Sequence, residues 1–426
     1  MTDILALADE LWTGARRVED THPFSLLGDA QEVADGVAFV PSFANVSAFS
    51  TDDGLVLVDT GSAPLAQHIH TTLRTWNSTP LHTAVFSHGH IDHVFGVAPF
   101  EQEAVDKGWA APKVLAHQAM PARFDRYQLT AGYNEVVNQR QFAMPDLRWP
   151  REYRYPDETY DGKHQLSVGG LELELTHCKG ETDDHTFTWI PERKVLCCGD
   201  LFIWASPNAG NPQKVQRFPK EWAVGLRAMA ALGAELMLPG HGVPVVGADR
   251  IRQALTDSAE LLEHLHDETV AMMNAGARLD EIVHTVRGPQ HLLDRPYLRP
   301  VYDEPEFVVR NVWRLYGGWY NGDPASLKPS PAAALATELA AMAGGAGKLA
   351  DRALALMPTD LRLAGHLAEL ATQASPDDPA LHQVRATVFA ARAEHEQSTM
   401  AKGVFSWAAR ESAALSVRPP SPIAHP

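Results

Sequence analysis

The sequence predicts a layered α/β fold followed by a predominantly helical second half. Two blocks, Glu32 to His93 and His164 to Phe202, contain short β-branched runs interrupted by Gly, Asp and Pro turn signals. From Trp222 onward, apolar residues recur instead at the spacing of amphipathic helices. Strands separated by single helices in two successive blocks are typical of an α/β sandwich.

Each block has an identifiable series of elements. In the first, the runs VADGVAFV, SAFSTDDGLVLVDTG and LHTAVFSHGH are expected to form strands. Residues Ala66 to Trp76 are expected to form a helix that ends before the turn at Asn77-Ser78. In the second block, QLSVGGLELELTHC alternates apolar and polar residues, and TFTWIPERKVLCCGDLF predicts a hairpin around Pro191-Glu192-Arg193.

The rest of the chain is predicted to be mostly helical. Trp222 to Leu232 and Ala248 to Asn274 are the expected helices on either side of a short run that reaches the PGHG sequence at residues 239–242. The Ala- and Leu-rich stretch Ala332 to Glu396 resembles stacked helical hairpins of the tetratricopeptide kind, without a clean register of roughly 34 residues. Such helix pairs bury their apolar faces against neighbours or another subunit.

The composition is that of a globular protein with an acidic charge balance. A length of 426 residues suggests two or three domains, and 36 Lys and Arg against 53 Asp and Glu give a formal charge of -17. Nucleic acid and anionic membrane surfaces are therefore not expected as partners, because binding phosphates requires a basic footprint. Membrane insertion is not expected either, since no apolar run approaches the roughly 20 residues that span a bilayer.

The cysteine content and the N-terminal sequence predict a cytoplasmic location. The three cysteines, Cys178, Cys197 and Cys198, do not form a disulfide framework, which favours a reducing compartment. The first residues, MTDILALADELWTGARR, lack the basic and then apolar pattern of a secretory leader.

The HGHIDH motif at residues 88–93 carries four potential metal ligands and directly follows an apolar run. Imidazole and carboxylate groups are ligands that Zn²⁺ and its first-row neighbours accept. His88 and His90 can point the same way from an extended segment, whereas Asp92 and His93 reach a second position. The spacing therefore predicts two metals side by side, and such a site supplies enough positive charge for a small anionic substrate.

The remaining ligands must come from other strand ends, where loops carry functional side chains over a rigid scaffold. The candidates are the segment THCKGETDDHTF beginning at Thr176, Asp200 in the CCGD turn, and His241 in PGHG. Taken singly, Asp200 could merely cap the segment that follows, and His241 could be an ordinary loop histidine. Their order after the HGHIDH motif favours a metal site.

These motifs and the run LVDTG at residues 57–61 resemble the metallo-β-lactamase superfamily, whose fold is an αββα sandwich with metals at one edge of its two sheets. The resemblance implies two Zn²⁺ per subunit on the following side chains: His88, His90 and one residue of 177–185 for the first ion, and Asp92, His93 and His241 for the second. Asp200 is expected to bridge both ions. Asp59 is expected to orient a ligand loop without binding metal.

The third ligand of the first ion is an open choice. Most members of the superfamily place a histidine in a Gly-His-Thr sequence, and Glu181 occupies that position in Gly180-Glu181-Thr182. A carboxylate is an acceptable zinc ligand, so Glu181 is the preferred candidate. His177 and His185 remain rivals, because ligand chemistry alone excludes neither. If it is not a ligand, His185 is expected to lie beside the ligands or in the pocket.

A glutamate at position 181 and the helical second half are similar to the alkylsulfatase branch, the type III sulfatases. The similarity includes SPNAGNPQKVQRFPKEW and YDEPEFVVRNVWRLYGGWYNGDPASLKP and extends from about residue 30 to about residue 410. It implies a catalytic domain at 1–248, a helical dimerization domain at 249–415 and a Pro-rich tail at 416–426. A homodimer is therefore expected.

Some features depart from that branch. Its long members carry an export signal and a further C-terminal lipid-carrier-like domain, neither of which is expected here. Their bridging carboxylate is often glutamate, whereas this chain has Asp200. The substrate is therefore expected to differ from a long detergent.

The resemblance implies a dinuclear zinc hydrolase that cleaves alkyl or aryl sulfate esters by metal-activated hydroxide, with Asp92 and Asp200 as catalytic carboxylates. Contacts to the anionic ester are expected from one turn-rich segment: Asn208, Asn211, Lys214 and Arg217. Arg217 can hold two oxygens at once. Weaker candidates are Arg140 for the anion and Phe202, Trp204 and Tyr133 for an apolar pocket.

Two alternatives remain. A related hydrolase could act on a phosphoester, lactone or thioester, because one metal core serves all these reactions. A non-catalytic scaffold with a metal site belongs to another class of function. It is disfavoured because every expected ligand position carries a usable side chain.

Overall fold

The computed structural model describes residues 3–417, which divide into two units. Unit 1 comprises Met1–Ala131 and Pro150–Trp319, and unit 2 comprises Gly132–Trp149 and Tyr320–Pro426. The domain boundary predicted between residues 248 and 249 stays a prediction. Most of the predicted tail, residues 418–426, lies outside the described residues.

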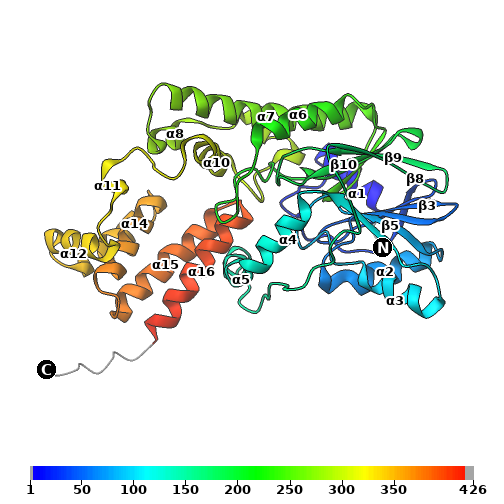
Figure 1. The fold of residues 1–426 in the computed structure, drawn as a ribbon. Coiled ribbons are helices and arrows are strands. Elements are labelled where there is room, and N and C mark those ends of the chain that lie inside the picture. Colours follow the sequence, from blue (N-terminus) through cyan, green and yellow to red (C-terminus); the bar gives the residue numbers. More distant parts are fainter. Residues whose placement is uncertain (1–2, 418–426) are drawn as a thin grey trace. The chain divides into compact units, whose positions relative to one another are not determined.

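The first sheet of unit 1 follows the order of the chain (Figure 1): β1 (Gln31–Ala34), β2 (Val37–Val40), β3 (Val46–Thr51), β4 (Gly54–Val58), β5 (Leu81–Val85), β6 (Lys113–His117) and β7 (Glu158–Tyr160). Neighbours from β1 to β4 are antiparallel, and those from β4 to β7 are parallel. Parallel neighbours need crossover connections, which α2 (Ala66–Trp76) and α3 (Ala98–Lys107) supply between β4, β5 and β6. The helix predicted for Ala66 to Trp76 is confirmed.

The second sheet has the spatial order β13-β12-β11-β10-β9-β8. Its strands are β8 (Lys163–Val168), β9 (Leu171–His177), β10 (Thr186–Ile190), β11 (Val195–Ile203), β12 (Leu236–His241) and β13 (Val245–Val246). The predicted hairpin around Pro191 is confirmed, because β10 and β11 pair antiparallel across the short helix Pro191–Arg193. Only β11 and β12 pair in parallel within the described sheet.

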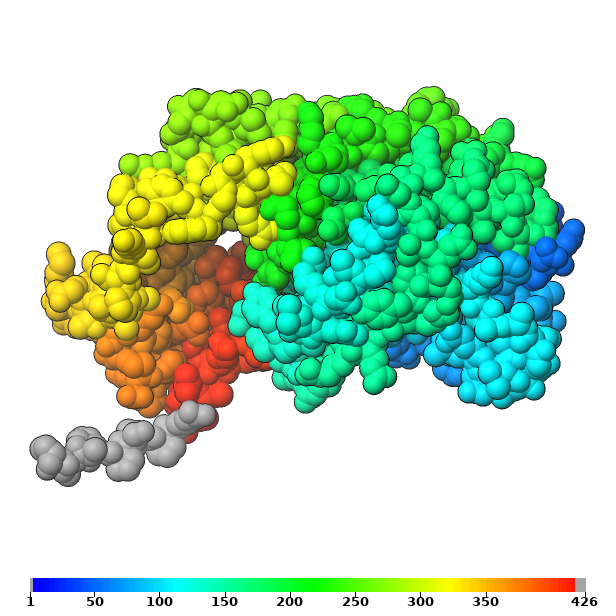
Figure 2. Space-filling model, viewed as in Figure 1, coloured from blue at the N-terminus to red at the C-terminus, as the bar shows by residue number. Residues whose placement is uncertain are grey.

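Helices cover the outer faces of the two sheets and complete the predicted αββα sandwich (Figure 1). On the first sheet, Ile69 and Leu73 of α2 pack with Leu57 and other buried apolar residues. On the second, α6 (Pro219–Ala230) contacts β11, and α7 (Ala248–Asn274) contacts β12 and β13. The outer face of α3 forms part of the surface at the lower right of the space-filling view (Figure 2).

The helices after the sandwich begin largely where the sequence predicts them. The helix expected from Trp222 begins earlier, at Pro219, because proline is favoured in the first turn of a helix. Unit 1 also contains the following helices: α1 (Ile4–Thr13), α4 (Met120–Leu129), α8 (Leu279–Thr285), α9 (Gln290–Leu293) and α10 (Pro305–Gly317). None of the helices within residues 3–417 combines enough length and apolar character to span a membrane.

The described part of unit 2 contains helices joined by turns and irregular segments, without strands. Its helices are α5 (Ala131–Phe142), α11 (Pro324–Leu327), α12 (Ala332–Ala343), α13 (Ala346–Leu356), α14 (Leu361–Ala374), α15 (Pro379–His395) and α16 (Thr399–Ser416). Small side chains let these helices approach closely, as Ala353, Ala364 and Ala368 do around Val388. The helical hairpins expected from the Ala- and Leu-rich stretch are therefore confirmed as packed helices.

Leu73→Ala is expected to lower the free energy of unfolding by about 2–5 kcal/mol, because it opens a cavity between α2 and the first sheet. The matched control is Leu129→Ala, since Leu129 is 85% exposed and its truncation should change stability by less than about 0.5 kcal/mol. Denaturant titration of both variants measures the difference. Equal effects of the two substitutions would contradict the packing described for α2.

Candidate metal centre

The predicted metal ligands lie where strands of each sheet end. The HGHIDH motif follows β5, and Asp59 follows β4 in the first sheet. In the second sheet, Glu181 follows β9, while Asp200 and His241 lie near the ends of β11 and β12. Because the carboxyl ends of strands with one direction meet at one edge, side chains far apart in sequence converge there.

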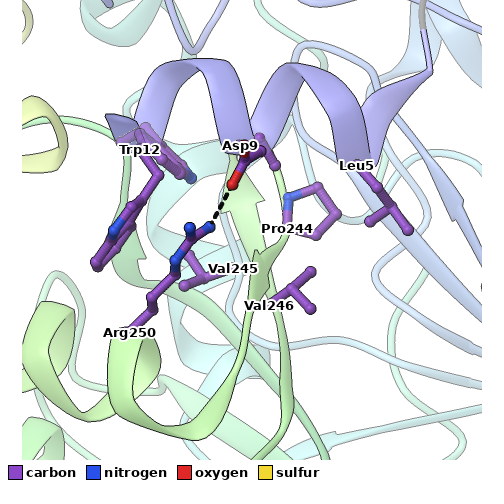
Figure 3. Close-up of a pocket in the computed structure, with 9 residues that line it drawn as sticks. Leu5, Asp9, Trp12, Pro244, Val245, Val246 and Arg250 are labelled. Carbon is purple, nitrogen blue, oxygen red and sulfur yellow. Dashed lines mark hydrogen bonds and ion pairs between the residues drawn. The ribbon is translucent and has the colours of Figure 1, made fainter. Parts of the chain in front are cut away.

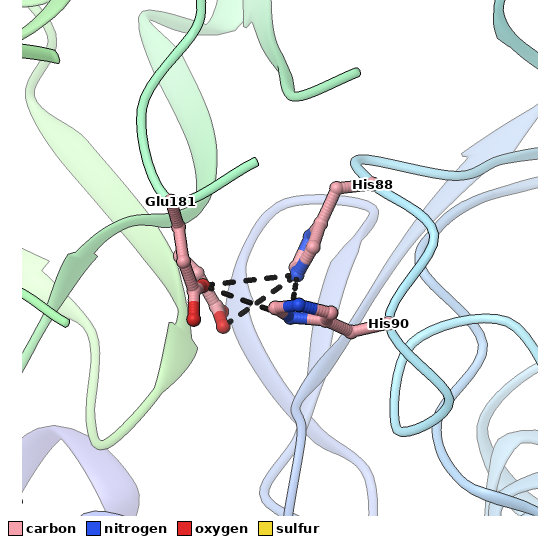
Figure 4. Close-up of side chains that lie close together, drawn as sticks. His88, His90 and Glu181 are labelled. Carbon is pink, nitrogen blue, oxygen red and sulfur yellow. Dashed lines mark hydrogen bonds and ion pairs between the residues drawn. The ribbon is translucent and has the colours of Figure 1, made fainter. Parts of the chain in front are cut away.

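A first group of side chains comprises His88, His90, Glu181 and Asp200. The Nε2 atom of His88 lies 3.8 Å from Oε2 of Glu181 and 3.7 Å from Oδ2 of Asp200. The Nδ1 atom of His90 lies 3.8 Å from the same Glu181 oxygen, and these side chains point toward one another (Figure 4). Ligands of one tetrahedral Zn²⁺ lie roughly 3.4 Å apart, so the spacing suits a single ion.

A second group comprises Asp92, His93 and His241. Oδ2 of Asp92 lies 3.7 Å from Nε2 of His93 and 3.4 Å from Nε2 of His241. Asp200 adjoins this group as well, with its Oδ1 3.3 Å from His93 Nε2 and its Oδ2 3.2 Å from His241 Nε2. The Asp200 carboxylate therefore lies between the two groups.

Contacts behind the ligands select the imidazole tautomers. His93 Nδ1 lies 2.8 Å from Oδ2 of Asp59, and His241 Nδ1 lies against the carbonyl oxygen of Phe43. Both oxygens are acceptors, so each Nδ1 carries a proton and each Nε2 faces the centre. His88 Nδ1 lies 3.0 Å from Ser87 Oγ, which itself donates to Asp59, and the same tautomer results.

Asp59 holds the motif loop from the end of β4. Its carboxylate accepts hydrogen bonds from the backbone N–H and the hydroxyl of Ser87, both at 2.7 Å. Its backbone has a φ of 59°, a conformation that is uncommon for residues other than glycine and is often found at functional sites. The next residue, Thr60, donates its N–H to the carbonyl of His93 at 2.7 Å. The loop is thus anchored at both ends of the motif.

Buried polar atoms at the centre show that the side chains suit a cation. Within the described residues, His93 Nε2, Glu181 Oε2 and Asp200 Oδ1 are buried and have no hydrogen-bond partner. A buried polar atom without a partner costs about 1–3 kcal/mol, so a cluster of lone pairs facing one another is unfavourable alone. Divalent cations would satisfy all of these atoms, and nitrogen and oxygen donors are those that zinc accepts.

Burial and neighbouring charges determine protonation at the centre. Burial lowers the pKa of His88 well below its usual value and favours the neutral imidazole. Burial also raises the pKa of Glu181 well above its usual value, although the Arg217 guanidinium opposes this shift. For Asp200, burial is outweighed by His241 and the other imidazoles, which hold the pKa of that carboxyl well below its usual range. The neutral His88 and ionised Asp200 are the forms that bind metal.

Glu181 contributes to the first group, whereas its two histidine rivals make other contacts. His185 Nε2 accepts the backbone N–H of Asp200 at 3.0 Å, and its ring stacks on His88 with 4.6 Å between centroids. His177 Nε2 bonds to the carbonyl of Asp183 at 2.9 Å. The pKa of His185 is lowered to about 4 by burial, which keeps its acceptor lone pair available to Asp200.

The predicted anion-binding residues lie beside Glu181 or in the turn that follows. Asn208 donates its amide to Oε1 of Glu181, and Arg217 donates to the Glu181 carbonyl while its second terminal nitrogen lies 3.4 Å from Oε1. The Oδ1 atom of Asn211 accepts the N–H of Gln213 within the turn. The pKa of Lys214 is lowered to about 7 by burial and by Arg217.

The residues that the sequence suggested less strongly for substrate binding do not belong to the two ligand groups. Arg140 and Tyr133 belong to unit 2, and Tyr133 is largely exposed. Phe202 is buried, and Trp204 lines a separate cavity of about 230 Å³ together with Trp12 and Pro244 (Figure 3). These aromatic residues therefore have the surroundings of core side chains.

Sequence reasoning missed an aromatic pair beside His241. The ring of Phe24 lies 4.0 Å from that of His241 and 4.2 Å from that of Tyr302. Tyr302 lies in the YDEPEF segment that the sequence singled out, whereas Phe24 precedes the first strand in a stretch without a local signal. Asp184, which accepts the N–H of Gly89, was also missed although it lies in THCKGETDDHTF.

Two family models match separate parts of the chain. The model described as "Metallo-beta-lactamase superfamily" matches residues 40–241, and the model described as "Alkyl sulfatase dimerisation" matches residues 278–414. In both regions the chain is similar to the alkylsulfatase branch of the metallo-β-lactamase superfamily. The relatives described below are named alkylsulfatases, and this similarity indicates that the chain is a hydrolase.

Curated relatives of this branch resemble the chain over most of its length. It is 28% identical to the linear primary-alkylsulfatase of Pseudomonas sp. (strain ATCC 19151), over 79% of this chain and 68% of that protein. It is 29% identical to an (R)-specific secondary-alkylsulfatase of Pseudomonas sp., over 68% of this chain but 47% of that protein. The chain thus spans about two thirds of the first relative and about half of the second.

A solved structure of the branch has the same fold. The stereoselective inverting sec-alkylsulfatase Pisa1 from Pseudomonas sp. superposes with a TM-score of 0.82 and 23% sequence identity. The match covers 92% of this chain and 66% of that chain. Both the sandwich and the helical region of the branch are therefore present here.

In the presence of a chelator, the protein is expected to lose stability as the pH falls from about 6.5 toward 4, in part through His185. The pKa of His185 in the folded protein, about 4, lies below the value of about 6.5 for the unfolded chain. The contribution of His185 to the free energy of unfolding is therefore complete above pH 6.5 and is lost on acidification. His185→Gln should reduce the loss between pH 7 and pH 4.5 by about 2 kcal/mol in denaturant titrations. His82→Gln, at an exposed position, is the control. An unchanged pH dependence in His185→Gln would contradict the buried neutral imidazole.

Proposed function

We propose that the protein is a dinuclear zinc hydrolase that cleaves alkyl or aryl sulfate esters. The observation that carries this proposal is the placement of the Asp200 carboxylate between two groups of ligand atoms at the sheet edge. Similarity to named alkylsulfatases supports the substrate class.

The proposed ligands follow the two groups: His88, His90 and Glu181 for one ion, Asp92, His93 and His241 for the other, and Asp200 for both. When bound, two zinc ions lower the pKa of water and offset negative charge on the ester oxygens. Asp59 fixes His93 through its Nδ1–H, and Asn208 and Arg217 fix Glu181. These contacts orient the ligands before substrate binds.

The charge of the proposed ligand set favours a singly charged ester. Two divalent cations are offset by the carboxylates of Asp92, Glu181 and Asp200, so a small net positive charge remains. A sulfate monoester carries a single negative charge, whereas a phosphate monoester approaches two near neutral pH. Glu181, in the place of a neutral histidine, therefore favours sulfate over phosphate at this centre.

Substrate contacts are proposed on two sides of the centre. Arg217, Asn208, Asn211 and Lys214 lie on the segment that follows Asp200, and they are proposed to bind the anionic group. Lys214, whose pKa is about 7, is expected to be only partly protonated near neutral pH. Phe24 packs against His241, Tyr302 packs against Phe24, and these rings are proposed to offer an apolar surface for the alkyl or aryl group.

The assembly and location are proposals of the same kind. The family model matched over residues 278–414 is described as a dimerisation model, which supports a homodimer. A cytoplasmic location is proposed because Cys178, Cys197 and Cys198 are all free thiols.

The purified protein is expected to hold two zinc ions per subunit and to hydrolyse short alkyl or aryl sulfates in preference to phosphate esters, lactones and thioesters. Asp200→Asn should lower kcat/KM at least about 100-fold, because its amide replaces one of the two proposed metal-binding oxygens by a donor. Glu263→Gln, which breaks a surface ion pair with Arg227, is the control. Activity toward another ester class without sulfate turnover would overturn the proposal.

Sedimentation at micromolar concentration is expected to give twice the mass of one 46.6 kDa chain. A homodimer would bury apolar helical surface of the region matched by the dimerisation model. A species with the mass of a single chain across that concentration range would contradict the proposed dimer.

A further inference from the structure

A buried ion pair adjoins the motif loop outside both ligand groups. Nε of Arg123, on α4, lies 2.9 Å from Oδ1 of Asp184, and these side chains are 2% and 0% exposed. The second carboxylate oxygen of Asp184 accepts the backbone N–H of Gly89 at 2.9 Å. Gly89 is the residue between His88 and His90, so Asp184 contacts the peptide that joins two proposed ligands of the first ion.

The space around Gly89 is filled by this pair. A Cβ atom at position 89 would lie 2.7 Å from Cδ of Arg123 and 3.0 Å from Oδ2 of Asp184. It would also lie 3.2 Å from a ring carbon of Phe124 on the same helix. The peptide between the two histidines therefore has little freedom to move toward α4, and glycine is required there by the close approach.

The short segment that carries Asp184 reaches the centre at other points too. Glu181 belongs to the first ligand group, and His185 accepts the N–H of Asp200 while stacking on His88. Asp184 connects this segment to the motif loop, and Arg123 connects it to α4. A movement of Asp184 would thus change the position of His88 and His90 relative to Glu181.

The cost of burying the charges of Arg123 and Asp184 indicates that this ion pair has a role other than stabilising the fold in general. Removing two charges from water costs several kcal/mol per ion, so a buried pair is often no more stabilising than apolar residues of similar size. The pair is favourable in only a narrow range of geometries, however, because each buried charge needs the opposite charge close beside it. A buried carboxylate that pairs with a guanidinium through one oxygen and accepts one backbone N–H through the other specifies one arrangement of that peptide.

We propose that Arg123 and Asp184 are positioning residues that set the relative geometry of His88 and His90 and thereby the affinity of the first metal position. The inference rests on the metal binding in the proposed function. Neither residue is placed among the metal ligands or the substrate contacts, so their effect is exerted through the Gly89 peptide.

The test uses Co²⁺ as a spectroscopic probe in chelator-treated protein, with circular dichroism and denaturant unfolding as controls for folding. Wild-type protein is expected to bind two Co²⁺ per subunit. Asp184→Asn should weaken binding of one of them about 10–100-fold and shift its visible absorption band. An amide has no charge to pair with Arg123, and its nitrogen, which is a donor, replaces one of the two oxygens that face the guanidinium and the Gly89 N–H. Arg123→Met should weaken the same ion, because it leaves Asp184 buried without its cation.

Asp183→Asn is the matched control. Asp183 is the adjacent residue and pairs with the same guanidinium, but it is 45% exposed and reaches Arg123 from the surface. Its substitution is expected to leave both Co²⁺ affinities within about threefold of wild type, as for an exposed ion pair.

The outcomes separate this inference from the proposed function. If wild-type protein binds two Co²⁺ and Asp184→Asn binds both with unchanged affinity and spectrum, the positioning role is wrong while the dinuclear centre stands. Fewer than two Co²⁺ in wild-type protein would contradict both. If neither Asp184→Asn nor Arg123→Met folds, the pair stabilises the whole domain and the inference is overturned.

Discussion

The carboxylate of Asp200 contacts both groups of candidate metal ligands, and the geometry of both groups depends on its position. It lies within β11, where its N–H is held by His185 and its two oxygens face imidazoles of both groups. Space for it comes from Gly240 of the PGHG sequence, since a Cβ at that position would lie 2.1 Å from Oδ1 of Asp200. The parallel pairing of β11 with β12 brings these two residues together, so the sheet topology and the site geometry have a common origin.

The candidate metal centre contains carboxylates and imidazoles that repel or desolvate one another, and contacts with the surrounding fold hold these side chains in place. Within the part of the chain that the structure describes, particular ligand atoms, among them His93 Nε2, Glu181 Oε2 and Asp200 Oδ1, are buried without a hydrogen-bond partner, which is unfavourable without a cation. Asp59 adopts an uncommon backbone conformation to orient Ser87 and His93 from one side. The hydrogen bonds of Asp59 therefore hold the motif loop and His93 in one arrangement, as expected of a site whose ligands must be arranged before metal binds.

Glu181 distinguishes this centre from the histidine-rich pattern of the wider superfamily. Its carboxylate is held by Asn208 and Arg217, two residues first predicted to bind the anionic substrate. The same donors can serve both purposes, because Arg217 has a fork of N–H groups and contacts Glu181 through its terminal nitrogens. The contacts that support Glu181 and the proposed substrate contacts therefore lie in one segment after β11.

Local signals explain how much the sequence could predict. The strands, the hairpin around Pro191 and the helix Ala66–Trp76 follow from periodicity and turn residues, which act over short distances. The HGHIDH motif likewise places its ligand types within one loop. The αββα order required the family resemblance as well, because local patterns specify elements more directly than their arrangement.

The sequence by itself therefore determined the elements with strong local patterns, the α/β fold class and a set of candidate metal-binding side chains. Only the tertiary structure showed the different contacts of His177, Glu181 and His185, which lie close in sequence but face different neighbours. It also placed Arg123 beside Asp184 and α5 among the C-terminal helices of unit 2. Contacts between residues far apart in the chain have no local signature, since they arise from how the packed elements meet.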